Sequence, residues 1–517
     1  MPYVLDDARR NAYAAFAARF PAPDRLFIEN HDGRRVTYGD VARQTARMAN
    51  LLRRLGVRPG DRVAGLLDKS PEGILLYLAC CRAGAGSLPV HVELAAPEID
   101  HILRDAEPVL VVCRPDFVAG LQGRVAAAPH HILTLDVLGG GTLIEALEGE
   151  AAEASPVPLG AEDPNAIVYT SGTTGKPKGA IIPNGLVIWN AMALAEAWGM
   201  TETDVLLHAN PMAFGLFGTT TPVLAAGARM RLLPKFQADA VIEALPGATV
   251  FAGVPTYYAR LLAHPGFSRD TCRSMRLFLT GSAPMRADLF EAFQARTGHQ
   301  LLDRYGMTEA LIITSMKLDG PRRPDASGIP LRDAALRVVD EAGNAVPPGT
   351  VGGIEIRQPF PFPGYWRAPE KTEAAFRQDG WFITGYFGRI DPDGALCVLG
   401  RGTELIISGG FNIYPKEVEA ALNAMPEIAE SAVIGVPHPD FGEAVVAAVQ
   451  LVPGAQGLSE DVAKERLAAG LARYKIPKRI EVIAEMPRNT LGKIRKNLLQ
   501  QRFADLFTAV KSRASRI

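Results

Sequence analysis

Short apolar runs alternate with stretches of helical periodicity along most of the chain. Residues 62–90 read RVAGLLDKSPEGILLYLACCRAGAGSLPV, which predicts a strand, a helix that begins after Ser70 and Pro71, and a second short strand. Similar apolar runs that end in turn residues are VLVVC (109–113), ATVFAGV (248–254) and MRLFLTGSAP (275–284). Strands that alternate with helices are typical of βαβ units, so the pattern predicts parallel α/β sheets.

The pattern changes after Pro324, where short strands with turn signals replace the alternation. DEAGNAVPPGTVGGIEIRQP (340–359) and GRIDPDGALCVLGRG (388–402) predict a small β-rich subdomain. From about Gly402, a helix, two strands and a second helix are expected at 416–423, 431–436, 445–452 and 460–472.

The predicted fold class is therefore α/β with two domains. A large N-terminal domain, residues 1–400, combines parallel α/β subdomains with the β-rich subdomain, and a small α+β C-terminal domain follows at 401–517. The Ala- and Gly-rich interval 139–165 is expected to be an excursion from the large domain rather than a folded unit of its own.

The composition indicates how many domains and which kinds of cysteine site to expect. A chain of 517 residues that is 48% hydrophobic has the length for roughly two to four domains with large cores. The five cysteines are odd in number and show no CxxC spacing, which favours reduced, buried thiols over a disulfide framework or a zinc site. They are Cys80, Cys81, Cys113, Cys272 and Cys397.

Charge and hydropathy also limit the partners that are expected. The formal net charge is −1, whereas a nucleic-acid partner needs a concentrated basic face. No apolar run approaches 18 residues, and the first 20 residues lack the apolar core of a signal peptide. We therefore expect no nucleic-acid partner, no membrane span and a cytoplasmic location; the sequence does not predict an oligomeric state.

The stretch YTSGTTGKPKGA (169–180) is rich in groups that bind phosphate. Its backbone amides and hydroxyls could form an anion-binding nest, to which Lys176 or Lys178 would add positive charge. It is not a Walker loop, because Pro177 follows the first lysine where that motif needs Ser or Thr. Taken alone, the stretch could equally be a mobile connection.

Four further motifs accompany this loop. They are YGMTE (305–309), WFITGYFGRID (381–391), GRGTELIISGGFNIYPKEVE (400–419) and PRNTLGKIRKN (487–497). Together they resemble the adenylate-forming superfamily of acyl-CoA synthetases, peptide-synthetase adenylation domains and luciferases, over roughly Leu26 to Asn497. LLPKF (232–236), GVPTYYARLL (253–262), RLFLTGSAP (276–284) and GVPHPDFGE (435–443) are most similar to malonyl-CoA synthetases.

The resemblance implies a two-step reaction that uses ATP, Mg²⁺ and coenzyme A on a small-molecule acid. It implies that the acid becomes an acyl-adenylate, from which the thiol of coenzyme A then displaces AMP. Lys493 is implied to stabilise negative charge in the first step, Thr308 to contact the α-phosphate and Glu309 to hold Mg²⁺. The alternative for Lys493 is a solvated basic tail, since IRKN follows it.

The remaining implied cofactor contacts come from several motifs. For the nucleotide and coenzyme A they are Thr170, Ser171, Gly172, Thr173, Thr174, Gly175, Lys178, Asp303, Tyr305, Gly306, Tyr386, Arg401, Gly409 and Gly410.

In related enzymes the small domain is a mobile lid that rotates about a hinge just after the residue that is Arg401 here. The rotation exchanges Lys493 for the SGGFN turn, in which Gly409 and Gly410 would line a passage for the pantetheine arm. The alternative is that these glycines only form a tight turn.

Two residues depart from the family pattern. Tyr386 replaces the aspartate that usually accepts hydrogen bonds from both ribose hydroxyls, and Thr403 stands where Asp or Lys is common at the hinge. Either Tyr386 merely weakens nucleotide binding, or the pocket has been rebuilt around an aromatic ring beside Trp381, Phe382 and Phe387.

The expected acyl pocket gives conflicting signals. PMAFGLFG (211–218), which includes the predicted pocket residue Phe214, replaces the histidine-containing IYHTHGLF of malonyl-CoA synthetases, and Ala310, Leu311 and Ile312 are apolar. Arg260 and Ser282 stand at positions similar to those that bind the second carboxylate, and a buried arginine demands an anionic or strongly polar partner. Arg260 could instead be a structural helix residue that pairs with an acid.

Three hypotheses for function follow. The first is an AMP-forming acid:CoA ligase for a small or medium carboxylic acid, with malonate-like diacids as the first candidates. The second keeps adenylation but replaces coenzyme A with a carrier protein or an amine, or activates an unusual acid such as nitrite for diazotisation. The third is a degenerate, non-catalytic nucleotide-binding protein, which Tyr386 and Thr403 would explain.

Overall fold

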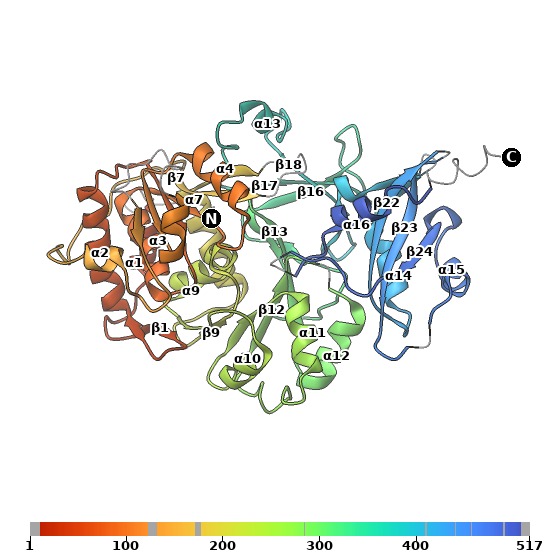
Figure 1. Cartoon of the computed structure of the whole chain (residues 1–517), viewed down its shortest axis with the longest axis horizontal. Coiled ribbons are helices and arrows are strands. Elements are labelled where there is room, and N and C mark those ends of the chain that lie inside the picture. Colours follow the sequence, from red (N-terminus) through yellow and green to blue (C-terminus); the bar gives the residue numbers. More distant parts are fainter. Residues whose placement is uncertain are drawn as a thin grey trace.

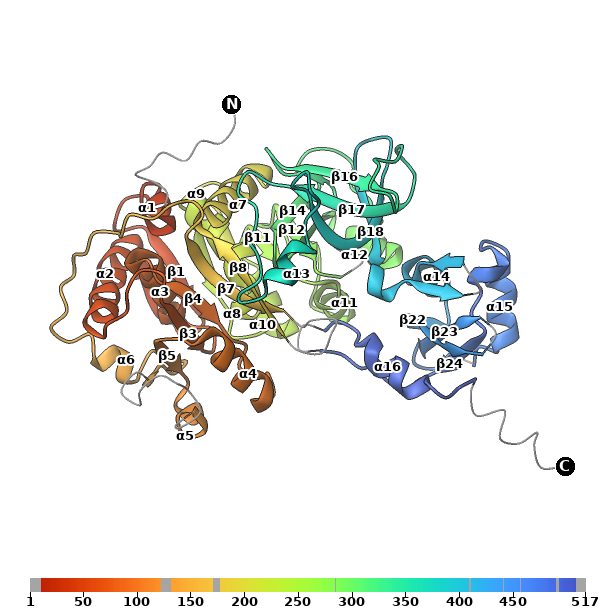
Figure 2. The same ribbon diagram turned by 90° about the horizontal axis from the view of Figure 1, so that it is seen from above.

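A computed structural model shows a large N-terminal unit, elements α1 to β19, and a smaller C-terminal unit, elements β20 to α16, at one end of the molecule (Figures 1 and 2). The structure describes residues 11–121, 132–170, 177–283, 285–408, 411–439, 441–455, 457–489 and 492–507. The α/β fold class is confirmed. The boundary at 400/401 stays a prediction.

A six-stranded sheet carries the phosphate-loop motif at one edge. Its order is β6(Ile132–Thr134)-β5(Leu110–Cys113)-β3(Arg62–Leu66)-β4(Gly86–Pro89)-β7(Pro164–Thr170)-β8(Lys178–Pro183). The predicted βαβ unit is present: β3 and β4 are parallel, and α3(Pro71–Ala83) connects them. Ser70 caps α3 by accepting from Gly73 N, Pro71 occupies its first turn, and Gly84 ends it at φ 77°, a conformation that favours glycine.

A nine-stranded sheet forms the centre of the N-terminal unit. Its order is β15(Ile329–Pro330)-β14(Leu311–Ser315)-β13(Leu301–Met307)-β12(Leu277–Gly281)-β11(Val250–Ala252)-β9(Val205–His208)-β10(Arg229–Leu232)-β1(Leu26–Asn30)-β2(Arg35–Thr37). The six strands from β13 to β1 in this order are parallel, so their carboxyl ends meet at one edge of the sheet. The YGMTE motif begins within β13 and ends just beyond it.

Helices cover both large sheets (Figures 1 and 2). Among them α7(Asn184–Ala197) is apolar on all sides and packs within the core, where Trp189 and Trp198 are fully buried. The other helices of the N-terminal unit are α1(Ala12–Ala17), α2(Tyr38–Arg54), α4(Ala96–Ala106), α5(Val118–Leu121), α6(Thr142–Glu145), α8(Met212–Gly215), α9(Thr221–Ala226), α10(Ala238–Ala244), α11(Pro255–Ala263), α12(Ala287–Thr297) and α13(Pro369–Glu373).

The predicted β-rich subdomain is an antiparallel four-stranded sheet. Its strands, in order, are β16(Ala335–Val339), β17(Gly352–Arg357), β18(Phe382–Ile390) and β19(Leu396–Arg401). In the β18–β19 hairpin Tyr386 lies directly opposite Arg401. This pairing brings together two residues that the sequence placed in separate motifs.

The C-terminal unit has its own sheet and core, as the α+β pattern predicted. The strands β21(Phe411–Ile413), β20(Ile406–Ser408), β23(Gly442–Leu451) and β22(Ile428–His438) lie in this order, and β24(Arg479–Val482) also pairs with β23. Val418, Val433 and Val445 lie in the core beneath α14(Pro415–Asn423) and α15(Glu460–Ala468). The last helix is α16(Lys496–Phe503).

The excursion at 139–165 contains one short helix, α6, and is tied to the large domain by arginines. Arg47 Nη2 of α2 donates to Leu147 O at 2.7 Å, and Arg54 Nε pairs with Glu150 Oε1 at 2.6 Å. All five cysteines are free and buried, as expected. No helix in the described part of the chain is long and apolar enough to span a membrane.

A buried lysine joins the two large sheets. Lys69 lies between β3 and α3, and its ammonium donates to Leu233 O at 2.8 Å and to His208 O at 3.3 Å, beyond β10 and at the end of β9. Burial lowers the pKa of Lys69 from 10.5 to about 7. The folded chain therefore binds fewer protons at this position than the unfolded chain between pH 7 and 10.5.

Because of this difference, the contribution of Lys69 to stability rises with pH across that window. Between pH 7.5 and 9.5 the free energy of unfolding of the parent should increase by up to about 2.5 kcal/mol because of Lys69. Lys69→Met should lack this increase. Denaturant titrations at the two pH values measure the difference, and Lys317→Met, at an exposed lysine, is the control. Equal pH slopes for the parent and Lys69→Met would contradict the expectation.

Candidate active site

The phosphate-loop motif is held in a β-hairpin. β7 and β8 are antiparallel, with Thr170 opposite Lys178. Five predicted phosphate-binding residues, Ser171 to Gly175, lie outside the described residues. The ammonium of Lys178 lies 5.4 Å from the centre of the Tyr365 ring, and Gly179 O accepts from Trp366 N at 2.7 Å. The segment around Tyr365 therefore fixes the end of the hairpin.

Tyr365 also reaches the predicted metal ligand. Glu309 is buried just beyond β13, and its Oε1 accepts a hydrogen bond of 2.8 Å from the Tyr365 hydroxyl. Burial raises the pKa of Tyr365, and the Glu309 carboxylate raises it further, so Tyr365 is a stable donor at neutral pH. Sequence reasoning missed this residue, which the loop sequence PFPGYW (361–366) does not distinguish from structural aromatics.

Three residues from three strands, β13, β18 and β19, form the neighbouring wall of the site. Arg401 Nε donates to the Tyr386 hydroxyl at 2.8 Å, and the Arg401 guanidinium lies 5.2 Å from the Tyr386 ring centre. The ring of Tyr386 meets that of Tyr305 edge to face, at 5.4 Å between centres and 74° between planes. Tyr386 is therefore anchored by both its ring and its hydroxyl, and the rebuilding of the pocket around it stays a prediction.

Lys493 approaches this wall from the C-terminal unit. Its pKa is lowered first by burial and then by the positive charge of Arg401, while Glu404 opposes the shift. Asn489 fixes the loop: its Oδ1 accepts from Lys493 N at 2.9 Å, and its own N–H donates to Lys493 O at 2.9 Å. Lys493 is thus half-buried beside Arg401 rather than part of a solvated tail.

The Lys493 loop also touches the large unit. Gly492 has φ 74°, and a Cβ at this position would lie 3.0 Å from Thr256 Oγ1 on α11. A side chain there would be both strained and crowded. Glycine therefore lets the loop approach α11 closely.

Asp303 and Gly306 of β13, which were predicted to contact the nucleotide, both have a structural role in the fold. Asp303 Oδ2 accepts from Ser327 Oγ at 3.0 Å, and burial raises the pKa of Asp303 to about 7. A Cβ on Gly306 would collide with Leu311 O, so the bulged β13–β14 pairing requires a glycine. Contact of either residue with the nucleotide stays a prediction.

The predicted substrate residues are less well supported. Arg260 lies in the last turn of α11 and is exposed, so the expectation that it is buried was wrong; among the described residues it forms no ion pair. Ser282 is also exposed and has φ 68°, a left-handed conformation rare for serine, directly after β12. The side chain of Phe214 lies outside what the structure describes.

Arg304 is a candidate that sequence reasoning missed. A Cβ on Gly218 would lie 3.4 Å from its Nη1 and 3.9 Å from Ile312 Cδ1, which places the guanidinium between two segments of the expected acyl pocket. Its Nε is buried without a hydrogen-bond partner, and in the described part of the chain Arg304 forms no ion pair. Burial lowers its pKa, although Asp303 and Tyr258 oppose the shift.

An arginine immediately before YGMTE, in a strand that begins with two leucines, is the sequence signal that could have identified this residue. The ring centre of Trp198 lies 5.9 Å from the guanidinium carbon of Arg304. The contact covers one face of the guanidinium and supplies no negative charge.

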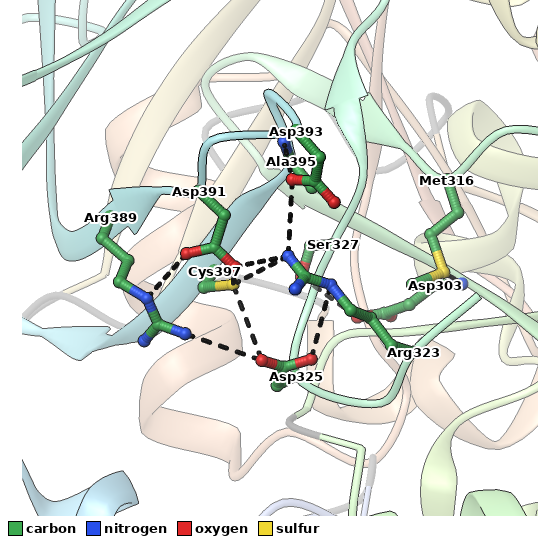
Figure 3. A network of polar contacts seen from close by, with 10 residues as sticks. All are labelled: Asp303, Met316, Arg323, Asp325, Ser327, Arg389, Asp391, Asp393, Ala395 and Cys397. Carbon is green, nitrogen blue, oxygen red and sulfur yellow. Dashed lines mark hydrogen bonds and ion pairs between the residues drawn. The ribbon is translucent and has the colours of Figure 1, made fainter. Parts of the chain in front are cut away.

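An acidic cluster near the hinge is compensated by arginines (Figure 3). Asp325, Asp391 and the Cys397 thiol have atoms within 4.8 Å of one another, a spacing compatible with a metal ion. However, Arg323 binds Asp391, and Arg389 Nε binds Asp391 Oδ1 at 2.8 Å. Burial raises the pKa of Cys397 to about 12, which keeps the thiol protonated. We interpret the cluster as a structural ion-pair network.

The predicted pantetheine turn is only partly described. Ser408 and Phe411 pair at the ends of β20 and β21, and Gly409 and Gly410 between them lie outside the described residues. Their proposed role in lining a passage therefore stays a prediction.

Comparisons with known proteins agree on one family. The family model "AMP-binding enzyme" matches residues 14–366, and "AMP-binding enzyme C-terminal domain" matches 417–493. Feruloyl-CoA synthase from Amycolatopsis sp is 35% identical over 92% of this chain and 95% of its own length. Indoleacetate–CoA ligase from Aromatoleum aromaticum is 36% identical over 94% of each chain.

A solved structure matches over nearly the whole chain. ATP-bound MatB from Rhodopseudomonas palustris is 42% identical, with a TM-score of 0.93 over 96% of this chain and 99% of that one. The apo structure of the same MatB has a TM-score of 0.83 at the same coverage. Together with the two matching family models, these likenesses show that the chain belongs to the AMP-binding enzyme family of adenylate-forming enzymes.

Proposed function

We propose that this enzyme activates a small carboxylic acid that carries a second anionic group, and that it transfers the acyl group to coenzyme A. Malonate-like diacids are the first candidates. Arg304 carries the proposal, because its guanidinium reaches the expected acyl pocket and finds no carboxylate in the described part of the chain. MatB of Rhodopseudomonas palustris and malonate–CoA ligase of Arabidopsis thaliana, 30% identical, support this substrate class.

A buried arginine is unfavourable unless a carboxylate or phosphate pairs with it. Gly218 and Ile312, which lie beside the Arg304 guanidinium, carry no charge, and the neighbouring Asp303 acts on it without forming an ion pair in the described part of the chain. A substrate with a second carboxylate would compensate the guanidinium while its first carboxylate reacts. Arg260, which is exposed, is not needed for this arrangement.

In the proposed first step, a carboxylate oxygen of the acid attacks the α-phosphorus of ATP, and pyrophosphate leaves. Lys178 and the 171–176 loop would hold the outer phosphates, and Thr308 the α-phosphate. Lys493 and Arg401, which lie close enough for the charge of Arg401 to lower the pKa of Lys493, would offset the negative charge that develops. The resulting acyl-adenylate retains the carbonyl carbon for the second step.

The residues present fit a magnesium ion at Glu309. Its buried carboxylate is the hard oxygen ligand that Mg²⁺ prefers, and Tyr365 orients it through one oxygen. The ion, when bound, neutralises part of the polyphosphate charge. Glu309 and Tyr365 position the ligand oxygen between the phosphate-loop hairpin and β13.

In the proposed second step, the thiol of coenzyme A attacks the adenylate carbonyl and AMP leaves. An exposed surface of the C-terminal unit supports this acceptor: Phe411 stacks on Tyr474 with ring centres 4.5 Å apart, and both rings are exposed. Lys478 lies 4.8 Å from the ring of exposed Phe441. Aromatic faces beside lysines suit the base and phosphates of a nucleotide such as coenzyme A.

The direct test combines an acid panel with one substitution. Enzyme and MgATP are incubated with diacids and monoacids, with and without coenzyme A, and the products are identified by mass spectrometry. We expect acyl-CoA from a diacid, and Arg304→Met should lower kcat/KM for that diacid by about 10- to 100-fold, as expected for loss of a charged hydrogen bond. Monoacids of similar length should keep or gain activity.

Arg260→Met is the matched control and should change diacid turnover by less than about threefold, because this arginine is exposed. Equal losses for diacids and monoacids in Arg304→Met would contradict the assignment of Arg304. Adenylate without a thioester product would point to another acceptor, such as a carrier protein or an amine.

A second prediction separates the two half-reactions. Lys493→Ala should abolish most adenylation, because it removes the cation beside Arg401. Thioester formation from synthetic acyl-adenylate and coenzyme A should stay within about tenfold of the parent, since the proposed pantetheine turn, not Lys493, serves that step. Rapid-quench measurement of each step provides the test; equal loss in both steps would refute the role of Lys493.

A third prediction concerns Tyr386. Tyr386→Asp removes the edge-to-face contact with Tyr305, and because Arg401 would face the new carboxylate, lost packing rather than an unpaired charge is the expected cost. An aromatic contact of about 1 kcal/mol corresponds to roughly fivefold weaker ATP binding, with lower turnover. Tyr386→Phe keeps the ring and should stay closer to the parent. Tighter ATP binding by Tyr386→Asp in calorimetry, with undiminished turnover, would refute this view.

A further inference from the structure

Lys416 crosses from one unit of the enzyme to the other. It lies in the first turn of α14, in the C-terminal unit, and α14 packs against β19 of the N-terminal unit. Figure 2 shows α14 facing the end of the N-terminal unit from which β18 descends. The ammonium of Lys416 donates to the backbone carbonyl of Val398 on β19. A side chain of the smaller unit is thus hydrogen-bonded to the larger one.

The strand that Lys416 binds is the strand that presents Arg401. Val398 lies three residues before Arg401 on β19, and Arg401 is the residue whose charge acts on Lys493. The hydrogen bond from Lys416 to Val398 therefore fixes α14 relative to β19. It thereby also fixes the position of the Lys493 loop relative to Arg401. Lys416 is thus attached to the same strand that carries Arg401, the residue that Lys493 approaches.

Negative charge inside the N-terminal unit faces Lys416. Burial lowers the pKa of Lys416, and the opposing contributions come first from Asp303 and then from Cys397, Glu419 and Asp325. Asp303 accepts from Ser327 through one oxygen, while its other oxygen is buried without a hydrogen-bond partner among the described residues. Lys416 thus brings positive charge to a buried carboxylate of the other unit.

The network in Figure 3 keeps these acids in place. Arg323 and Arg389 bind Asp391 and lie beside Asp325, and Ser327, which binds Asp303, follows in the same segment. The arginines compensate Asp325 and Asp391, whereas none of them pairs with Asp303 in the described part of the chain. Asp303 is therefore the carboxylate that depends on Lys416.

Two other polar contacts join the units among the described residues. Arg286, just before α12, donates to Ala429 O, and Lys496 of α16 lies 3.6 Å from Glu404 at the hinge. Lys496 also binds Glu419 within its own unit, at 2.7 Å.

Two arrangements of the units are compatible with this family. At equal coverage the ATP-bound MatB structure matches this chain with a TM-score of 0.93 and the apo structure of the same protein with 0.83. The two MatB structures therefore differ in how closely they match this chain. The present structure corresponds more closely to the ATP-bound one.

We propose that Lys416 is a positioning residue: by binding Val398 where α14 packs against β19, it selects the orientation of the C-terminal unit that places Lys493 beside Arg401. Lys416 contacts no reacting atom. It acts on the first half-reaction through Lys493, and the second half-reaction does not require it.

The first test measures orientation without substrate. The five native cysteines are buried, so nitroxide labels can be placed on Glu291→Cys of α12 and Glu465→Cys of α15, both exposed positions. Electron–electron distance measurements on the full chain should show that Lys416→Met shifts the ratio of orientations by about tenfold. Lys416→Arg, which keeps the charge, should restore most of the parent distribution.

Lys464→Met is the matched control. Lys464 also donates to a backbone carbonyl, Lys478 O at 2.7 Å, but both residues belong to the C-terminal unit. This variant should leave the distance distribution unchanged. If Lys416→Met does not fold, Asp303→Asn removes the carboxylate of the other unit that acts electrostatically on Lys416, and it should shift the ratio in the same direction.

The second test compares the rates of the two half-reactions. It rests on the proposed function, because it requires that the enzyme forms an acyl-adenylate. Lys416→Met should lower the adenylation rate by about tenfold and leave thioester formation from synthetic adenylate within about twofold, whereas a merely destabilised unit would impair both steps. An unchanged distance distribution, or equal loss in the two steps, overturns the proposal. If the parent activates no acid at all, the proposed function fails, while the distance measurement still decides the role of Lys416.

Discussion

Positive charge gathered from distant parts of the chain is the constraint on which this active site depends. Arg401 and Lys493 lie close enough for one charge to lower the pKa of the other, and they come from different units. Like charges repel at short range, most strongly where water is partly excluded. The fold therefore has to hold these cations together until a polyanionic ligand arrives, and this requirement explains why the hinge is so densely bonded.

The supports are rigid strands and their turns. The β18–β19 pairing presents Arg401 opposite Tyr386, while the β7–β8 hairpin presents Lys178 against Tyr365. Glu309, buried at the end of β13, supplies negative charge on the same side and is oriented by Tyr365. Because each group is mounted on a paired strand or beside one, little reorganisation is needed when charge develops in the transition state.

Much of this could be predicted from sequence, because local patterns determine it. Apolar runs located strands β3, β4, β5, β11 and β12 of the two large sheets, and turn signals located the β-rich subdomain. The error at Arg260 was avoidable: Pro255, Tyr258 and Leu261 are the buried residues of α11, and this spacing leaves Arg260 on the opposite face. Arg304 and Tyr365 were missed because their importance arises from partners distant in sequence.

Tyr386 shows how a departure from the family pattern fits the same constraint. An aspartate at this position would place a further negative charge on Arg401, beside those of Glu404 and Glu309, whereas a phenol accepts the hydrogen bond from Arg401 and leaves more of its positive charge uncompensated. The charge of Arg401 is then available to the ligand, and it also increases the repulsion that Lys493 experiences. An arrangement with more uncompensated charge at the interface needs an additional attachment between the units. The contact of Lys416 with Val398, supported by the buried carboxylate of Asp303, provides such an attachment on the same strand as Arg401.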